Sequence, residues 1–186
     1  MTRFIVLAAF LSSIANAQDV PPPPKPADDG PSLADTMKFI EDKLNSIGPV
    51  NYIAYTHDNV TGNNATNKFS AELTNVRGNV AGCRIDYHWR NTRDGRILQD
   101  LDAGFPLKPV NQVRVKTREQ ELKEGSSNGG HPEWASRVYP TVFVISVEVG
   151  PNGNTLCLFD ESLANRIAKA LVHAVELCGG GTKEPF

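Results

Sequence analysis

The sequence predicts an α+β protein: a curled antiparallel sheet or half-barrel of about seven strands, closed by a C-terminal amphipathic helix and preceded by one N-terminal helix. Two observations lead to this prediction. Between residues 51 and 159, apolar and polar residues alternate in short segments separated by turn formers. Residues 32–48 and 161–178 instead carry apolar side chains at helical spacing. Strands joined by short turns pair antiparallel, and a sheet of this many strands curls or splits into two packed layers.

Residues 1–17 have the pattern of a secretory signal peptide. Arg3 gives a positively charged start, residues 4–14 form an apolar run, and Ala15–Asn16–Ala17 supplies small residues for a signal peptidase. We therefore expect cleavage between Ala17 and Gln18 and an exported protein, either periplasmic or secreted. Because no cysteine follows the cleavage site, we expect no bacterial lipid anchor.

The exported chain is expected to begin with a proline-rich tether over residues 18–31, QDVPPPPKPADDGP, because polyproline is extended and has nothing to bury. Residues 32–186 then suffice for a single globular domain. Ser32 and Asp35 have the spacing of a helix capping box, and Gly48 ends the first helix. Its apolar stripe consists of Leu33, Met37, Ile40, Leu44 and Ile47.

Alternation predicts the strands that follow, and turn formers separate them. Residues 58–66 are expected to be a polar loop, 104–110 irregular, and 125–132 a flexible tip. Two questions stay open. Residues 133–149 are either one long strand or two halves broken at Pro140. The strand at 112–118 either ends there or continues its pairing as far as Leu122. The predicted strands are 51–57, 67–77, 80–90, 96–101, 112–118, 133–149 and 155–159.

The C-terminal helix is predicted over residues 161–178, with Asp160 as its N-cap and the glycines at 179–181 as its end. Its apolar stripe should plug the open end of the sheet, with the three larger side chains as anchors. The stripe consists of Leu163, Ile167, Leu171, Ala174 and Cys178.

Three cysteines in an exported protein imply one pair and one leftover thiol. Alternation places Cys83 on the apolar face of a strand, together with Ile85, and helical spacing places Cys178 on the apolar stripe. A Cys83–Cys178 disulfide is therefore favoured, with Cys157 unpaired and buried. Three reduced cysteines remain the alternative.

The charge balance limits the candidate partners. Without residues 1–17, the chain has 18 basic and 21 acidic residues, and they do not form basic clusters. We therefore expect no nucleic acid and no anionic lipid as partners. No second apolar run approaches the roughly 20 residues of a membrane span. The common phosphate-loop, nucleophile-elbow, metalloprotease, paired-cysteine and dinucleotide motifs are absent, so we predict no catalytic residues, no metal and no cofactor.

Four residues are candidate site residues. Asp86 and His88 lie two positions apart on the outward face of one predicted strand, where a carboxylate beside an imidazole can form a metal half-site or an acid–base pair. We favour the alternative, a polar sheet face with cross-strand charge pairs. His131 and Trp134 follow the glycine-rich tip, which could act as a lid or a partner-binding tip; a plain hairpin loop is favoured.

The 58–66 loop also contains two sequons for N-glycosylation, at Asn59 and Asn64. On a eukaryotic secretory route these would be acceptors on a surface loop. In a bacterial protein they would indicate only that the loop is exposed.

The order of seven strands and a closing helix over about residues 50–178 resembles the pleckstrin-homology-like barrel. Lipid-binding members of that class hold phosphoinositides with basic residues in the loop between the first two strands. Residues 58–66 contain no Lys or Arg, so the resemblance implies the scaffold and not that ligand. The ending FDESLANRIAKALVHAVELCGGGTKEPF also resembles that of small exported bacterial proteins of uncharacterised function, which implies a bacterial source and a stand-alone domain.

We therefore predict an exported, non-catalytic interaction or binding module of unknown ligand, whose candidate partner is a protein of the cell envelope. One alternative is a periplasmic or secreted enzyme of unfamiliar type that uses Asp86 and His88, or His131. Another is a structural envelope protein. An enzyme should gather two or more of these titratable groups in a concave pocket, whereas a binding module should scatter them over a convex face.

Overall fold

The computed structural model describes residues 30–58, 61–127, 134–150 and 152–181. The predicted signal peptide and nearly all of the predicted tether lie outside these residues. From Pro31 onward, the described residues contain three helices and eight strands. They are α1 (Leu33–Asn45), β1 (Val50–Asp58), β2 (Asn64–Asn79), β3 (Arg84–Arg93), β4 (Arg96–Pro106), β5 (Val110–Thr117), α2 (Arg118–Ser127), β6 (Trp134–Tyr139), β7 (Phe143–Val149), β8 (Asn152–Leu158) and α3 (Glu161–Leu177).

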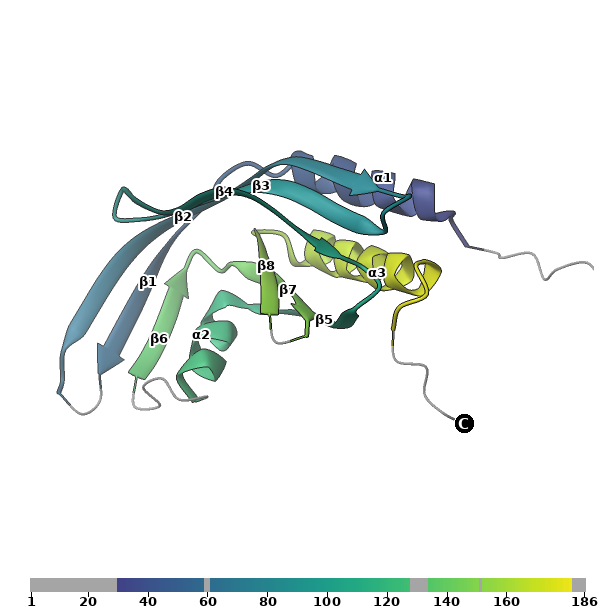
Figure 1. Ribbon diagram of the computed structural model, residues 1–186. Coiled ribbons are helices and arrows are strands. Elements are labelled where there is room, and N and C mark those ends of the chain that lie inside the picture. Colours follow the sequence, from purple (N-terminus) through teal and green to yellow (C-terminus); the bar gives the residue numbers. More distant parts are fainter. Residues whose placement is uncertain (1–29, 59–60, 128–133, 151, 182–186) are drawn as a thin grey trace, which may run out of the picture. The chain divides into compact units, whose positions relative to one another are not determined.

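The strands form two antiparallel sheets. The first has the order β4-β3-β2-β1-β6, and the second has the order β5-β7-β8. Figure 1 shows the long strands of the first sheet arching over the smaller second sheet, with α1 and α3 side by side. The predicted α+β class with an N-terminal and a C-terminal helix is confirmed. In the described residues the sheet is split into two open layers rather than closed into a barrel, and there is one strand more than expected.

One of the points at which the chain passes from one sheet to the other falls at Pro140. β6 pairs with β1 in the first sheet, whereas β7 is the central strand of the second. The segment predicted at 133–149 is therefore two strands separated at Pro140, which confirms the second alternative of the sequence analysis. A proline has no N–H to donate to a strand ladder, so pairing ends there and the chain passes to the other layer.

Helix α2 was not predicted; the sequence analysis extended strand pairing toward Leu122 instead. Thr117 and Gln120 form a capping box that starts the helix. The Gln120 N–H donates to Thr117 Oγ1 at 3.2 Å, and the Thr117 N–H donates to Gln120 Oε1 at 2.8 Å. This local signal was present in the sequence and outweighs the alternation of the preceding strand.

Several further boundaries differ from the prediction. β2 begins at Asn64, within the expected loop 58–66, and α2 extends to Ser127, into the expected tip 125–132.

Residues 104–110 were expected to be irregular, but β4 continues to Pro106. β4 is an edge strand, and edge strands tolerate proline. β3 begins only at Arg84, so Cys83 lies in the preceding turn with a φ of 45° and not on the apolar face of a strand.

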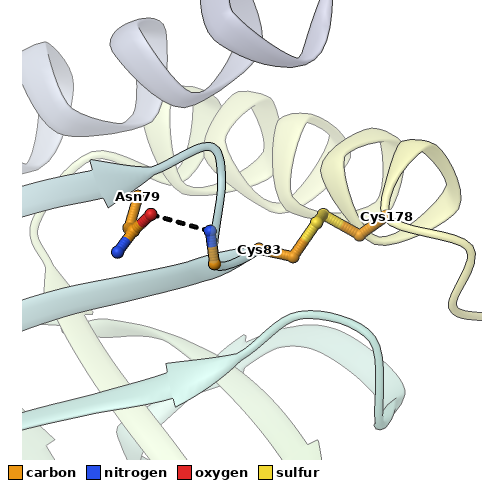
Figure 2. The surroundings of a disulfide bond; sticks show 4 residues. Asn79, Cys83 and Cys178 are labelled. Carbon is orange, nitrogen blue, oxygen red and sulfur yellow. Dashed lines mark hydrogen bonds between the residues drawn. A yellow bond between two sulfur atoms is a disulfide. The ribbon is translucent and has the colours of Figure 1, made fainter.

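The predicted disulfide nevertheless forms: Cys83 is bonded to Cys178, at the C-cap of α3. Figure 2 shows the bridge joining the β2–β3 turn to the end of the helix. Asn79 holds the turn in place, since its Oδ1 accepts the Gly82 N–H at 2.8 Å. Cys157 is the free cysteine, as predicted, but the residue is only partly buried.

Both terminal helices begin where their caps predict. Ser32 Oγ accepts the Asp35 N–H at 3.2 Å, and Asp160 Oδ1 accepts the Leu163 N–H at 2.9 Å. Ile167 and Leu171 are fully buried in the main core, while Leu163 is only partly buried at its margin. The core thus joins α1, α3 and both sheets, and it fixes the two layers around the residues described next.

Candidate functional site

Asp86 and His88 lie on the outer face of β3, as predicted, and both line a hollow of about 680 Å³. His88 is held between two carboxylates of β4: its Nδ1 lies 2.9 Å from Asp102 Oδ1 and its Nε2 2.8 Å from Asp100 Oδ1. Asp86 instead accepts a hydrogen bond from Arg84 Nε at 2.6 Å. These five residues therefore form cross-strand and same-strand charge pairs on the outer face of the sheet.

This arrangement leaves His88 poorly suited to catalysis or to metal binding. The hydrogen bonds to Asp102 and Asp100 raise the pKa of His88 above its ordinary value of 6.5, so its charged form is favoured. A metal ligand or a general base needs a neutral ring nitrogen with a free lone pair. Among the described residues, no group of three or more His, Cys, Asp or Glu side chains has the arrangement of a metal site.

We expect proton NMR to show a raised pKa for His88, and Asp102→Asn to lower it toward 6.5. Because the folded protein holds this proton more tightly than the unfolded chain, the pairs favour folding below about pH 6.5 and lose that contribution as the pH rises through the folded pKa. Asp42→Asn removes the same charge on α1, where Asp42 pairs with Lys38, and should leave the titration unchanged. An unshifted His88 in the parent protein would show that the ring is not held this way.

Of the other pair of predicted site residues, the structure places only Trp134, and only through its strand. His131 lies outside the described residues. Trp134 is the first residue of β6 and stands opposite Asp58 in the register with β1; two strands, β2 and β1, separate β6 from β3. Trp134 therefore belongs to a different part of the sheet from Asp86 and His88.

The inner face of β3 and β4 lines a cavity that the sequence analysis did not predict. Its volume is about 300 Å³, and it lies between the first sheet, β8 and the first residue of α2. Residues 87, 89 and 91 of β3 stand opposite 103, 101 and 99 of β4, and all six line the cavity. Alternation along β3 thus gives one strand a charged outer face and a cavity-lining inner face.

Aromatic side chains in the wall of the cavity are held in fixed positions. Tyr87 is buried, and its hydroxyl donates to Asn154 Oδ1 at 3.1 Å, which connects the two sheets. Trp89 Nε1 donates to Gln99 Oε1 at 3.1 Å. Tyr52 stacks on Phe69 with ring centroids 5.2 Å apart. A wall whose side chains are already ordered loses little further conformational entropy when a ligand binds.

Arg118 carries the one charged side chain among the cavity-lining residues that the structure describes. It starts α2, and its Nη1 donates to Glu121 Oε2. Thr155 Oγ1 donates to the other oxygen of Glu121 at 3.3 Å. Burial by itself lowers the pKa of Arg118, but Glu121, together with Tyr52 and Cys157, outweighs burial and the pKa is raised. The guanidinium and the carboxylate therefore form an ion pair with no net charge.

Two polar atoms of cavity-lining residues have no hydrogen-bond partner in the described part of the chain. They are Oδ1 of Asn91 and Nε of Arg118, and both are buried. An unpaired buried donor or acceptor costs about 1–3 kcal/mol, so a native structure that keeps one needs a reason for it.

The remaining titratable groups of the cavity are inert at neutral pH. Burial raises the pKa of the Cys157 thiol to about 12, so it stays protonated and is a poor nucleophile. Burial also raises the pKa of Tyr52 and of Tyr87. The cavity can therefore accept hydrogen bonds, donate them and provide apolar contact, but these groups are not tuned to transfer protons.

Comparisons with protein-family models, curated proteins and solved structures give no match. The resemblance to the pleckstrin-homology-like barrel therefore remains a prediction. Within the described residues, no helix is both long enough and apolar enough to cross a membrane.

Proposed function

We propose that this protein is an exported, non-catalytic binding module that takes a small ligand in the cavity between its two sheets. The signal-peptide pattern of residues 1–17 and the Cys83–Cys178 disulfide support export, since disulfides persist in oxidising compartments. The cavity itself is the observation that carries the proposal. Ordered aromatic and amide side chains line it, and two of its residues keep buried polar atoms unpaired.

The enzyme alternative is less well supported. The outer hollow does gather Asp86, His88 and Asp102, which is the geometry that an enzyme was expected to have. Each of these groups, however, is held by an oppositely charged neighbour, and the raised pKa of His88 favours the protonated ring. A general base near neutral pH needs a pKa close to the working pH and a free acceptor.

A thermal-shift screen of the exported chain against neutral, anionic, cationic and apolar small molecules tests the proposal. We expect at least one class to raise the Tm of the parent protein. Leu101→Arg should abolish that shift, because Leu101 lines the cavity and is 44% exposed, so a longer side chain there blocks the opening. Ile97→Arg is the matched control: the residue lies on the same strand, is 55% exposed and does not line the cavity. Equal loss of binding in both variants, or no shift with any class, would contradict the proposal.

A protein partner in the cell envelope is the second candidate, and the edge of the first sheet favours it. β4 is an edge strand of 11 residues that exposes Ile97, Leu98 and Leu101. An exposed edge with apolar side chains can pair with an extended segment of another chain. Ile97→Arg separates the two candidates, because it should reduce affinity capture of such a partner from an envelope extract while leaving the thermal shift unchanged.

A further inference from the structure

We propose that the ligand of the cavity is an uncharged polyhydroxylated molecule, a mono- or disaccharide. This inference rests on the binding function proposed above and specifies its ligand class. The cavity of about 300 Å³ lies at the lower end of the size range of small-molecule pockets, which suits a ligand of one or two sugar rings.

The charge of the cavity argues for a neutral ligand. Among the described residues that line the cavity, Arg118 is the only one with a charged side chain, and Glu121 already neutralises it. An anionic ligand would have to displace Glu121, and a cationic one would meet a guanidinium. In either case one charged group, the displaced Glu121 carboxylate or the cationic ligand itself, would be left in the cavity region without an oppositely charged partner, which costs several kcal/mol. A neutral ligand avoids this penalty.

The hydrogen-bonding groups of the cavity argue for hydroxyls. Asn91, Gln99 and Asn154 each carry an amide, which has both donors and an acceptor, and a hydroxyl is likewise donor and acceptor. Asn91 Oδ1 is an unpaired acceptor and Arg118 Nε an unpaired donor. Both atoms are inaccessible to water, so pairing requires either side chain to turn toward the ligand. That movement is favourable because it removes the cost of a buried unpaired group.

The aromatic side chains argue for a ligand with an apolar face as well. Tyr52, Tyr87 and Trp89 line the cavity beside these amides. An aromatic ring has a partly negative face that attracts polarised C–H groups. A sugar ring presents such C–H groups on its faces and hydroxyls around its edge. Aromatic and amide groups in one small, uncharged cavity therefore match this chemistry better than that of a purely polar or a purely apolar ligand.

Trp89 makes the inference testable by fluorescence. The chain has two tryptophans, so the Trp134→Phe variant leaves Trp89 as the only one. We expect a saturable fluorescence change with at least one of glucose, N-acetylglucosamine, cellobiose or chitobiose, at a Kd below about 10 mM. The charged analogues glucuronic acid and glucosamine should bind at least about ten-fold more weakly, since they place a charge in the cavity.

Asn91→Leu distinguishes a ligand-binding role of Asn91 from a purely structural one, because the two roles predict different effects on sugar affinity and on the Tm. The substitution removes the unpaired amide and keeps a similar volume, so we expect sugar binding to weaken at least about ten-fold while the Tm stays equal or rises. Gln99→Leu, on the exposed edge strand, is a second variant with the same expected loss of binding if Asn91→Leu does not fold.

The outcomes separate the inference from the function on which it rests. If all the neutral sugars fail while a charged or apolar compound produces a thermal shift that Leu101→Arg abolishes, the ligand class is wrong and the binding function stands. If no compound of any class binds, both are wrong. Sugar binding that Asn91→Leu and Gln99→Leu leave unchanged would also overturn the assignment to this cavity.

Discussion

Leu171→Ala is expected to lower the free energy of unfolding by about 2–5 kcal/mol. Leu171 is completely buried in the middle of α3, in the core that α1 and both sheets share. Truncation removes the apolar contact and leaves a cavity that the surrounding strands, which are held in their ladders, cannot close.

Urea denaturation of the exported chain measures this effect. Val172→Ala is the control, since Val172 is the next residue of the same helix, is 42% exposed and loses fewer contacts. We expect the control to stay within about 0.5 kcal/mol of the parent protein. Equal stability of Leu171→Ala and Val172→Ala would mean that α3 does not close the core as described.

Removal of the disulfide by the double substitution Cys83→Ser and Cys178→Ser is expected to cost up to about 4–5 kcal/mol. The two cysteines are 95 residues apart in the sequence, so the bridge greatly restricts the unfolded chain. In the chain-entropy model this restriction is the main source of the stability that a disulfide provides, and strain in the folded state reduces it.

A reductant provides the matched comparison. We expect it to destabilise the parent protein and Cys157→Ala by similar amounts, because Cys157 is the free cysteine. It should not change the stability of the double serine variant. A parent protein whose stability does not respond to reductant would contradict a bridge between the β2–β3 turn and α3.

The sequence predicted what depends on neighbouring residues. Ser32 and Asp160 start the two terminal helices because a capping side chain reaches an N–H only three positions away. The outward side of β3 was placed correctly, since alternation determines which residues share a face. The same reasoning paired Cys83 with Cys178, although Cys83 turned out to lie in a turn rather than in a strand.

The sequence did not predict what depends on distant residues. Periodicity in 133–149 cannot tell that β6 joins β1 and β7 joins β5, because the choice of sheet depends on packing. The residues that line the cavity are scattered along the sequence between Tyr52 and Cys157, and together they form no local sequence motif. Arg118 could have been found through the Thr117–Gln120 capping box, which marks the start of α2.

Amide chemical-shift mapping tests the central claim, which is that the cavity between the sheets is the ligand site. The ¹⁵N-labelled exported chain is titrated with the compound that raises its Tm most. We predict that the shifts change at Ala71, Gln99 and Gly153, which line the cavity from β2, β4 and β8. Changes confined to Arg84, His88 and Asp102 on the outer face would place the ligand on the opposite side of the sheet and contradict the account.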